Sequence, residues 1–132
     1  MVTQYFWPEN MRINNMVEGF VAKGHEVTVL TGQPNYPEGL VYADYLRDPA
    51  QFSHYQGASI VRVPMLARGK RSITLALNYL SFFTSASIFG CYKLRGQSFD
   101  AIFVYGVSPI MGAIPALVLG RLKNAPVFVW VL

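Results

Sequence analysis

Residues 1–30 of the chain read MVTQYFWPENMRINNMVEGFVAKGHEVTVL, and they predict a strand, a helix and a second strand in that order. Met1–Phe6 has the composition of a short strand, and the bulky turn WPEN ends it. Apolar residues then recur at helical spacing, at Ile13, Met16, Val17, Phe20 and Val21. Gly24 stops this helix, and Glu26–Leu30 is rich in β-branched residues. A strand, a helix and a strand within about 30 residues indicate a right-handed βαβ unit with parallel strands.

The same alternation continues along the chain. Ala58–Val63 and Ala101–Tyr105 predict strands, and a helix is expected from Ser108-Pro109 to about Lys123, imperfect because of its Gly and Pro residues. Pro126–Leu132 is a continuous apolar strand of the kind buried on both faces. Residues 40–57 show no clean period and predict an irregular segment with one short helix. The expected fold class is α/β, an open parallel sheet with helices on both faces.

The composition narrows the class of protein. The chain has 132 residues, of which 52% are hydrophobic and 14% are charged, so it can bury a core and is not intrinsically disordered. This length fits one domain. The single cysteine, Cys91, excludes a disulfide within the chain and a cysteine-based metal site, and its apolar neighbours indicate a small buried side chain.

The charges are distributed unevenly. Residues 1–48 carry three Lys or Arg against six acids, whereas residues 49–132 carry eight against Asp100 alone. The basic half is also the more apolar half. Basic charge beside apolar surface favours an anionic membrane as partner over nucleic acid.

Residues 72–92 contain no charge and are flanked by basic residues, Arg68, Lys70 and Arg71 before them and Lys93 and Arg95 after them. Three interpretations remain open: a helix of the domain with one exposed apolar face, a helix lying on a membrane, or a true membrane span. The scattered Ser, Thr and Asn residues favour the first. The cluster Arg68, Lys70 and Arg71 is either a solvated turn or a contact for anionic lipid or a lipid-linked diphosphate.

In an open parallel sheet, ligands bind beyond the carboxyl ends of the strands. Four segments fall there, at residues 7–10, 31–39, 64–70 and 106–109. His25 and Asp100 fall at the opposite end, which makes His25 a poor catalytic candidate. The glycine-rich phosphate-binding fingerprints and the nucleophile elbow are absent, so the usual nicotinamide, ATP or serine-hydrolase sites are disfavoured.

Three features could take part in binding. Glu9 is either an acceptor for sugar hydroxyls or a favourable charge at a helix N-terminus. The loop NYPEG, residues 35–39, combines two nearby prolines, a glycine and polar side chains, which suits carbohydrate recognition or an ordinary turn. Ser108 begins a helix whose free backbone amides could bind an anion, or it is a plain cap.

Three segments resemble the N-terminal part of bacterial family-4-like glycosyltransferases: TQYFWPEN-x-R-I-N, then GHEVTVLTG-x-PNYPEG, and the closing FVWVL. The resemblance covers nearly the whole chain in the right order, and the members most similar to it act in O-antigen, capsule and colanic acid synthesis, including the L-fucosamine transferase type. It implies a GT-B fold of two Rossmann-like domains that face each other across a cleft. In such proteins the N-terminal domain mainly binds the acceptor, often a lipid-linked sugar at the inner face of the plasma membrane.

The resemblance also implies the reaction and its residues. The C-terminal domain would bind a nucleotide-sugar donor through a paired-glutamate motif, and transfer would proceed with retention and usually without a metal or other cofactor. Residues matching the acceptor-side motifs would line the cleft: Glu9, Asn10, Arg12, Asn35, Tyr36, Glu38 and Gly39. The donor domain has no counterpart here, so we expect residues 1–132 to form an incomplete acceptor-side domain that is inactive alone. The alternative is a non-catalytic module that docks to a membrane or a partner.

Overall fold

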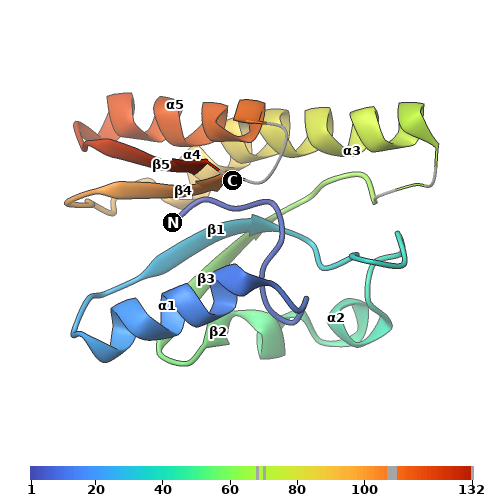
Figure 1. Cartoon of the computed structure of the whole chain (residues 1–132), viewed down its shortest axis with the longest axis horizontal. Helices are drawn as coiled ribbons and strands as arrows, with labels where there is room; N and C mark the ends of the chain where they lie inside the picture. Colours follow the sequence, from blue (N-terminus) through green and yellow to red (C-terminus); the bar gives the residue numbers. More distant parts are fainter. Residues whose placement is uncertain (68, 70, 107–109, 132) are drawn as a thin grey trace.

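The computed structural model describes residues 1–67, 69, 71–106 and 110–131, with the backbone alone at 110 and 111. A twisted sheet runs through the molecule with helices on either side (Figure 1). Strands β1 (Thr28–Gly32) and β3 (Ala58–Val63) pair in parallel, and β4 (Ile102–Gly106) pairs in parallel with β5 (Val127–Val131). Strand β2 (His54–Tyr55) adds to β3 in the antiparallel sense.

Val2 joins the two groups of strands. It bridges in parallel to Leu30 of β1 and to Val104 of β4, so the spatial order is β5, β4, Val2, β1, β3, β2. The predicted strand over residues 1–6 is therefore in the centre of the sheet, but the prediction of a regular strand was wrong beyond Val2. The Thr3 hydroxyl donates to the Tyr5 carbonyl at 3.1 Å, and the chain bends there instead of continuing the ladder.

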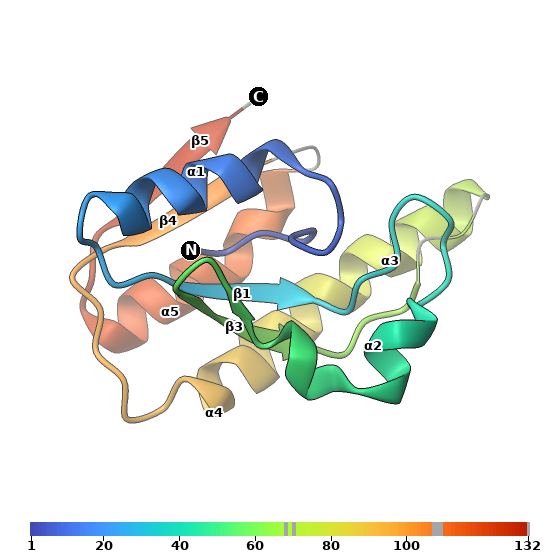
Figure 2. The same ribbon diagram turned by 90° about the horizontal axis from the view of Figure 1, so that it is seen from below.

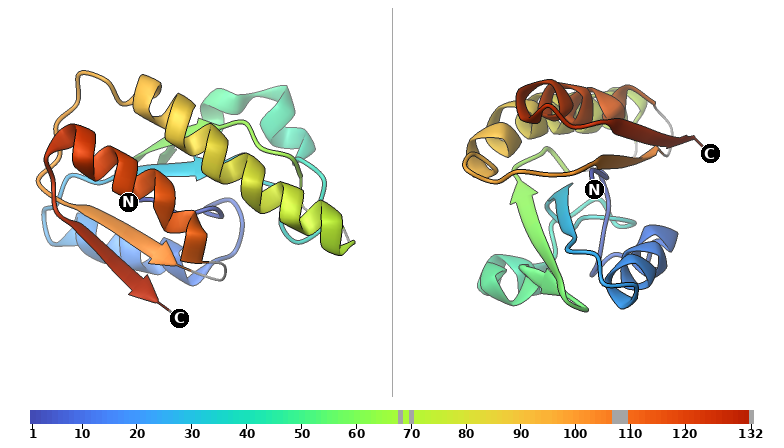
Figure 3. Two further views of the ribbon diagram at one scale, coloured as in Figure 1. Left: turned by 90° about the horizontal axis from the view of Figure 1, so that it is seen from above. Right: turned by 90° about the vertical axis from the view of Figure 1, so that its left-hand side faces the viewer.

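Helices cover both faces, as expected. Helix α1 (Arg12–Ala22) lies on one side of the sheet, while α3 (Ser72–Ser85) and α5 (Ile114–Lys123) lie on the other. Figure 2 shows α1 in front of the sheet and α3 and α5 behind it, and Figure 3 shows α3 and α5 next to each other in one outer layer. Helix α3 continues through a π-helical turn (Ala86–Gly90) into α4 (Cys91–Lys93). The α/β fold and the parallel pairing are therefore confirmed.

Two hydrophobic clusters stabilise the two faces. On the α3–α5 side, Leu30, Val63, Phe82 and Val104 belong to one buried cluster. On the α1 side, the second cluster contains Phe6, Ile13, Val17, Val29 and Ile60. The helical spacing of Ile13 and Val17 predicted a helix with one buried face. This is confirmed, because both side chains are buried in the cluster between α1 and the sheet.

Other details differ from expectation. The segment 40–57 contains α2 (Ala43–Arg47) and a 3₁₀ turn (Pro49–Phe52) before β2. The predicted short helix is therefore present, whereas the 3₁₀ turn and the strand were not predicted. Strand β5 is not buried on both faces: Phe128 is 57% exposed and Trp130 48%. Within the described residues β5 pairs with β4 alone, so the prediction from its apolar run was wrong about burial.

Candidate functional site

Glu9 joins the two loops that the sequence singled out. Its side chain is fully buried, and its oxygens accept hydrogen bonds from three backbone amides. Oε1 accepts from Phe6 at 3.2 Å, and Oε2 accepts from Asn35 at 3.0 Å and from Tyr36 at 2.6 Å. The Asn14 amide donates to the Glu9 carbonyl at 2.9 Å. Glu9 therefore holds the first loop and the 35–39 loop together, a role that neither of its two sequence-based hypotheses included.

The pKa of the Glu9 carboxyl group lies close to neutral pH. Burial raises its pKa from an ordinary 4.5 to about 7, although the three amide bonds and the positive charge of Arg62 oppose the shift. Burial outweighs them because the charged form loses its hydration. Glu9 can thus gain or lose a proton in the physiological pH range.

The 35–39 loop is held by its own backbone as well. The Gly39 amide donates to the Asn35 carbonyl at 2.7 Å, and Gly39 has a φ of 79°, which L side chains rarely adopt. The Tyr42 hydroxyl donates to the Tyr36 carbonyl at 2.5 Å. These bonds give Tyr36 a defined position, and its ring lies 5.4 Å from that of Tyr5.

Arg62 is a structural residue that the sequence analysis missed. It is only 8% exposed, and its guanidinium donates to three carbonyls, at the end of β1, at the end of the 3₁₀ turn and in the loop after the N-terminal segment. Nε reaches Phe52 at 3.2 Å, Nη1 reaches Gly32 at 3.0 Å, and Nη2 bonds Trp7. The sequence could not predict these hydrogen bonds, because Arg62 is a single arginine within a strand and its partners lie up to 55 residues away.

A cavity of about 190 Å³ lies at the carboxyl ends of β4 and the N-terminal segment. Its walls combine residues 2–5, Met11 and Ile13 at the start of α1, Tyr36, helix α3, the end of β4 and Gly112. The aromatic lining consists of Tyr5, Tyr36, Tyr79, Phe82 and Tyr105. This is the end of the sheet where the parallel topology predicts a ligand.

A small polar network lies beside this cavity. Asn78, fully buried on α3, accepts hydrogen bonds through Oδ1 from Gln4 Nε2 at 2.7 Å and from the Tyr5 hydroxyl at 3.0 Å. Its Nδ2 donates to the Leu66 carbonyl at 2.6 Å. Asn78 thereby connects helix α3 to the N-terminal segment at Gln4 and Tyr5, and to Leu66 in the chain that precedes the helix.

The structure separates the predicted acceptor residues. Tyr36 alone among them lines the cavity, whereas Glu9 and Asn35 are fully buried beneath it. Asn10, Arg12 and Glu38 are exposed, and Gly39 is half-buried. Lining residues outside the prediction include Gln4, Tyr5, Tyr79 and Tyr105. The first two lie in the quoted TQYF segment, and Tyr105 ends a predicted strand next to the segment 106–109, but no sequence pattern links Tyr79 to the cavity.

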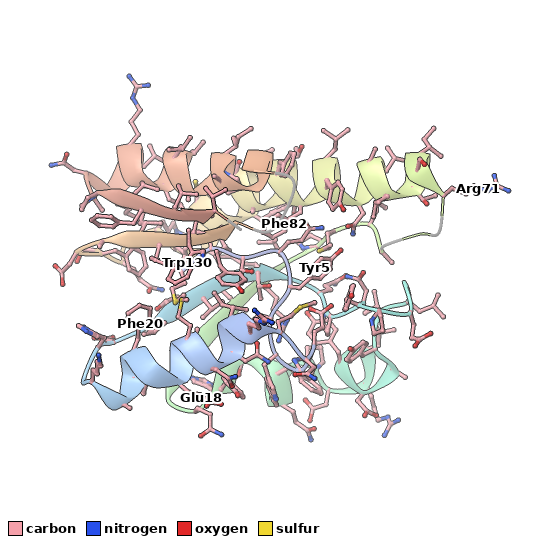
Figure 4. All side chains as sticks on the ribbon, in the orientation of Figure 1. Tyr5, Glu18, Phe20, Arg71, Phe82 and Trp130 are labelled. Carbon is pink, nitrogen blue, oxygen red and sulfur yellow. The ribbon has the colours of Figure 1, made fainter. Side chains whose placement is uncertain are left out.

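Several candidates fall outside this site. Ser108, Arg68 and Lys70 lie outside the described residues, so their proposed anion and membrane contacts stay predictions. Arg71 is exposed at the start of α3 and points away from the body of the molecule (Figure 4). Burial raises the pKa of the half-buried Cys91 thiol. No three His, Cys, Asp or Glu side chains gather within the part of the chain that the structure describes.

The outer layer of α3 and α5 exposes a row of aliphatic side chains, here named the α3–α5 face: Ile73, Leu77, Leu80, Ile88, Ile114, Leu117 and Leu122. The helix Ser72–Lys93 is long and apolar enough to cross a membrane. However, its inner side supplies Phe82, Phe83 and Ala86 to the core. This supports the interpretation of a domain helix with one exposed apolar face.

The mainly parallel sheet, with a cavity at the carboxyl ends of its strands, defines an α/β domain with a candidate ligand site. The chain belongs to the glycosyl transferase 4-like domain family, whose model matches residues 10–131. It is similar to the protein named "Putative colanic acid biosynthesis glycosyl transferase WcaI" of Escherichia coli (strain K12). The two are 32% identical over 112 residues, which are 83% of this chain and 26% of WcaI. The chain thus spans about a quarter of that relative's length, and no solved structure gives a significant match.

Proposed function

We propose that residues 1–132 form the acceptor-side, Rossmann-like domain of a GT-B glycosyltransferase that builds cell-surface polysaccharide of the O-antigen, capsule or colanic acid type. The observation that carries the proposal is the aromatic cavity at the carboxyl ends of the strands, in a chain of the glycosyl transferase 4-like family. The name of the relative WcaI supports the link to polysaccharide synthesis.

In this proposal the reaction needs a second domain. A nucleotide-sugar would bind to the donor domain and the saccharide acceptor to this one, and transfer requires both to be held in one geometry. The 132 residues alone then bind acceptor without transferring sugar. The L-fucosamine transferase type is one specificity that fits this scheme.

The acceptor would be lipid-linked, and the domain would work at the cytoplasmic face of the bacterial inner membrane. The α3–α5 face supports this, because seven exposed aliphatic side chains lie on helices that contain no acidic residue. Arg71, Arg95 and Arg121 are exposed beside it. Apolar surface flanked by basic charge is the pattern that binds anionic lipid interfaces.

Transfer is tested with a chimera in which the matching stretch of WcaI is replaced by this chain. The chimera and the 132-residue chain are each incubated with labelled nucleotide-sugars and a bacterial lipid extract. We expect label in the lipid fraction with the chimera and none with the chain alone. Transfer by the chain alone would contradict the assignment of the donor site to a second domain. A chimera that folds but labels no lipid with any donor would favour the non-catalytic docking module.

Membrane contact is tested by flotation with vesicles. The wild-type chain should float with phosphatidylglycerol vesicles and less with phosphatidylcholine vesicles. The double variant Leu77→Asp/Leu80→Asp should lose binding by at least tenfold, because it places charge in the α3–α5 face. Leu46→Asp is the control, since Leu46 is also exposed, at 63% against 45% for Leu77 and 52% for Leu80, but lies on α2. Equal binding of all three proteins would remove the membrane proposal.

A further inference from the structure

The cavity between α3 and the N-terminal segment is small, and its described lining residues carry no charge. Its volume of about 190 Å³ lies below the roughly 300–1,000 Å³ of sites for drug-sized ligands, so it suits one ring-sized group. Among its described lining residues there is no Asp, Glu, Lys, Arg or His. Against the lining residues that the structure describes, a charged ligand would lose its hydration without gaining a partner of opposite charge.

The walls of the cavity suit a particular surface chemistry. Tyr5 and Tyr36 form a pair of rings with centroids 5.4 Å apart and planes inclined at 48°. Phe82 and Tyr5 lie in the space between α3 and β1 (Figure 4). The face of an aromatic ring carries partial negative charge, and the C–H groups on one face of a pyranose are apolar and weakly positive. Hydroxyl groups at the ring edge could then bond to neutral polar groups such as the Gln4 amide.

The rings are held in place by residues beneath them. The Asn78 Oδ1 accepts from the Tyr5 hydroxyl at 3.0 Å, and the Glu9 carboxylate accepts from the Tyr36 amide at 2.6 Å. Both holding groups are fully buried. The two sequence segments containing WPEN and PNYPEG thus contribute one ring each to a single preorganised wall.

We propose that this cavity binds one uncharged pyranose unit of the acceptor against the rings of Tyr5 and Tyr36, with Glu9 and Asn78 as positioning residues. The inference rests on the proposed function, which makes a saccharide the ligand class. It adds that the bound unit is neutral, and that any diphosphate or uronic acid of the acceptor lies outside the cavity.

The test is saturation-transfer NMR on the 132-residue chain with a panel of methyl hexopyranosides and with glucuronate as the charged counterpart. The neutral glycosides should bind at least tenfold more tightly than glucuronate. Tyr36→Ala should weaken that binding at least tenfold, whereas Tyr36→Phe, which keeps the ring, should stay within about threefold. Tyr92→Ala is the matched control, because Tyr92 is 62% exposed on α4 and does not line the cavity.

The positioning role of Asn78 is tested by measuring glycoside affinity and thermal unfolding on the same variant. Asn78→Asp keeps the acceptor oxygen for the Tyr5 hydroxyl, but it loses the donor to the Leu66 carbonyl and introduces a charge beside the cavity. It should weaken the binding of neutral glycosides while thermal unfolding stays cooperative. The proposal is overturned if glucuronate binds as tightly as the neutral sugars, if Tyr36→Ala binds like the wild type, or if no glycoside binds. When the WcaI chimera still transfers sugar in any of these cases, the cavity assignment fails and the proposed function stands.

Discussion

Glu9 and Arg62 show how two buried ionisable side chains can organise loops without forming an ion pair. Glu9 accepts from backbone amides, and Arg62 donates to backbone carbonyls, so each satisfies groups that the irregular loops would otherwise leave unpaired. They act on the same region, since Arg62 bonds Trp7 and Glu9 bonds Phe6. The loops at the carboxyl edge of the sheet therefore have defined positions before any ligand binds.

The raised pKa of Glu9 predicts a pH-dependent stability. The ordinary pKa of 4.5 applies to the unfolded chain and about 7 to the folded one, so between these values the folded state holds more protons. The contribution of Glu9 to the free energy of unfolding should therefore fall as pH rises from 4.5 to 7, by about 3 kcal/mol at most, whereas the buried N-terminal amine, whose pKa burial lowers from 8.0 to about 5, changes stability in the opposite sense over much of that range. Urea unfolding of Glu9→Gln should lack the falling contribution, whereas the exposed Glu38→Gln should keep the wild-type profile. Parallel profiles for all three proteins would contradict the prediction.

Arg62 predicts a loss of stability on substitution. Arg62→Met leaves one buried and two partly buried carbonyls without their donor and should lower the free energy of unfolding by about 3–5 kcal/mol. The lysine ammonium of Arg62→Lys can replace only some of the three guanidinium hydrogen bonds. Its free energy of unfolding should therefore lie between those of Arg62→Met and the wild type. Arg47 provides the control, because it pairs with Asp44 on the surface with both side chains at least 75% exposed, and Arg47→Met should change stability by less than about 0.5 kcal/mol. Urea denaturation would refute this view of Arg62 if its two variants matched Arg47→Met.

At the scale of elements, the long helix Ser72–Lys93 carries two different surfaces. Phe82, Phe83 and Ala86 pack into the core, while Ile73, Leu77 and Leu80 are exposed. Its π-helical turn ends at Gly90, where any side chain would press on β1: an added Cβ would lie 2.7 Å from Leu30 Cδ2. Gly90 thus allows the helix to approach the sheet closely.

Two glycines make this argument testable. Gly90→Ala should lower the free energy of unfolding by about 1–3 kcal/mol, since Leu30 is buried and must shift. Gly19→Ala should raise it by about 0.5–1 kcal/mol, because Gly19 is exposed inside α1 and an added Cβ meets nothing within 4 Å. Thermal or urea unfolding of both variants gives the signs. The same sign for both would mean that helix propensity, and not contact with Leu30, governs Gly90.

The elements themselves were largely predictable, and the site was not. Ala58–Val63 is a strand at its predicted bounds, because β-branched residues and a following proline act locally. The Glu9–Tyr36 bond spans 27 residues and the Tyr5–Asn78 bond spans 73, so neither leaves a local pattern. The family resemblance predicted Glu9 and Asn35 at the cleft, whereas the structure buries both side chains.

At the scale of the whole molecule, charge and exposed apolar surface coincide. The acids of the first 48 residues lie on the α1–α2 side or in the loops, whereas the helices of the α3–α5 face contain none. The cavity shares helix α3 with that face, since Asn78, Tyr79 and Phe82 turn inward where Leu77 and Leu80 turn outward. A domain resting on a membrane through this face would hold the cavity at the lipid surface, where a lipid-linked saccharide is found.

This arrangement predicts that binding to anionic vesicles depends on salt and on particular arginines. Arg71→Gln/Arg121→Gln should weaken flotation with phosphatidylglycerol vesicles by on the order of tenfold at low salt, because each basic residue near an anionic surface contributes about 1 kcal/mol. The effect should shrink toward roughly 0.5 M salt, where screening shortens the reach of the charges. Arg12→Gln/Arg47→Gln removes the same charge from exposed positions on α1 and α2 and should leave flotation within about twofold. Equal losses in the two double variants would mean that net charge alone, and not the orientation of the α3–α5 face, attracts the chain to the vesicle.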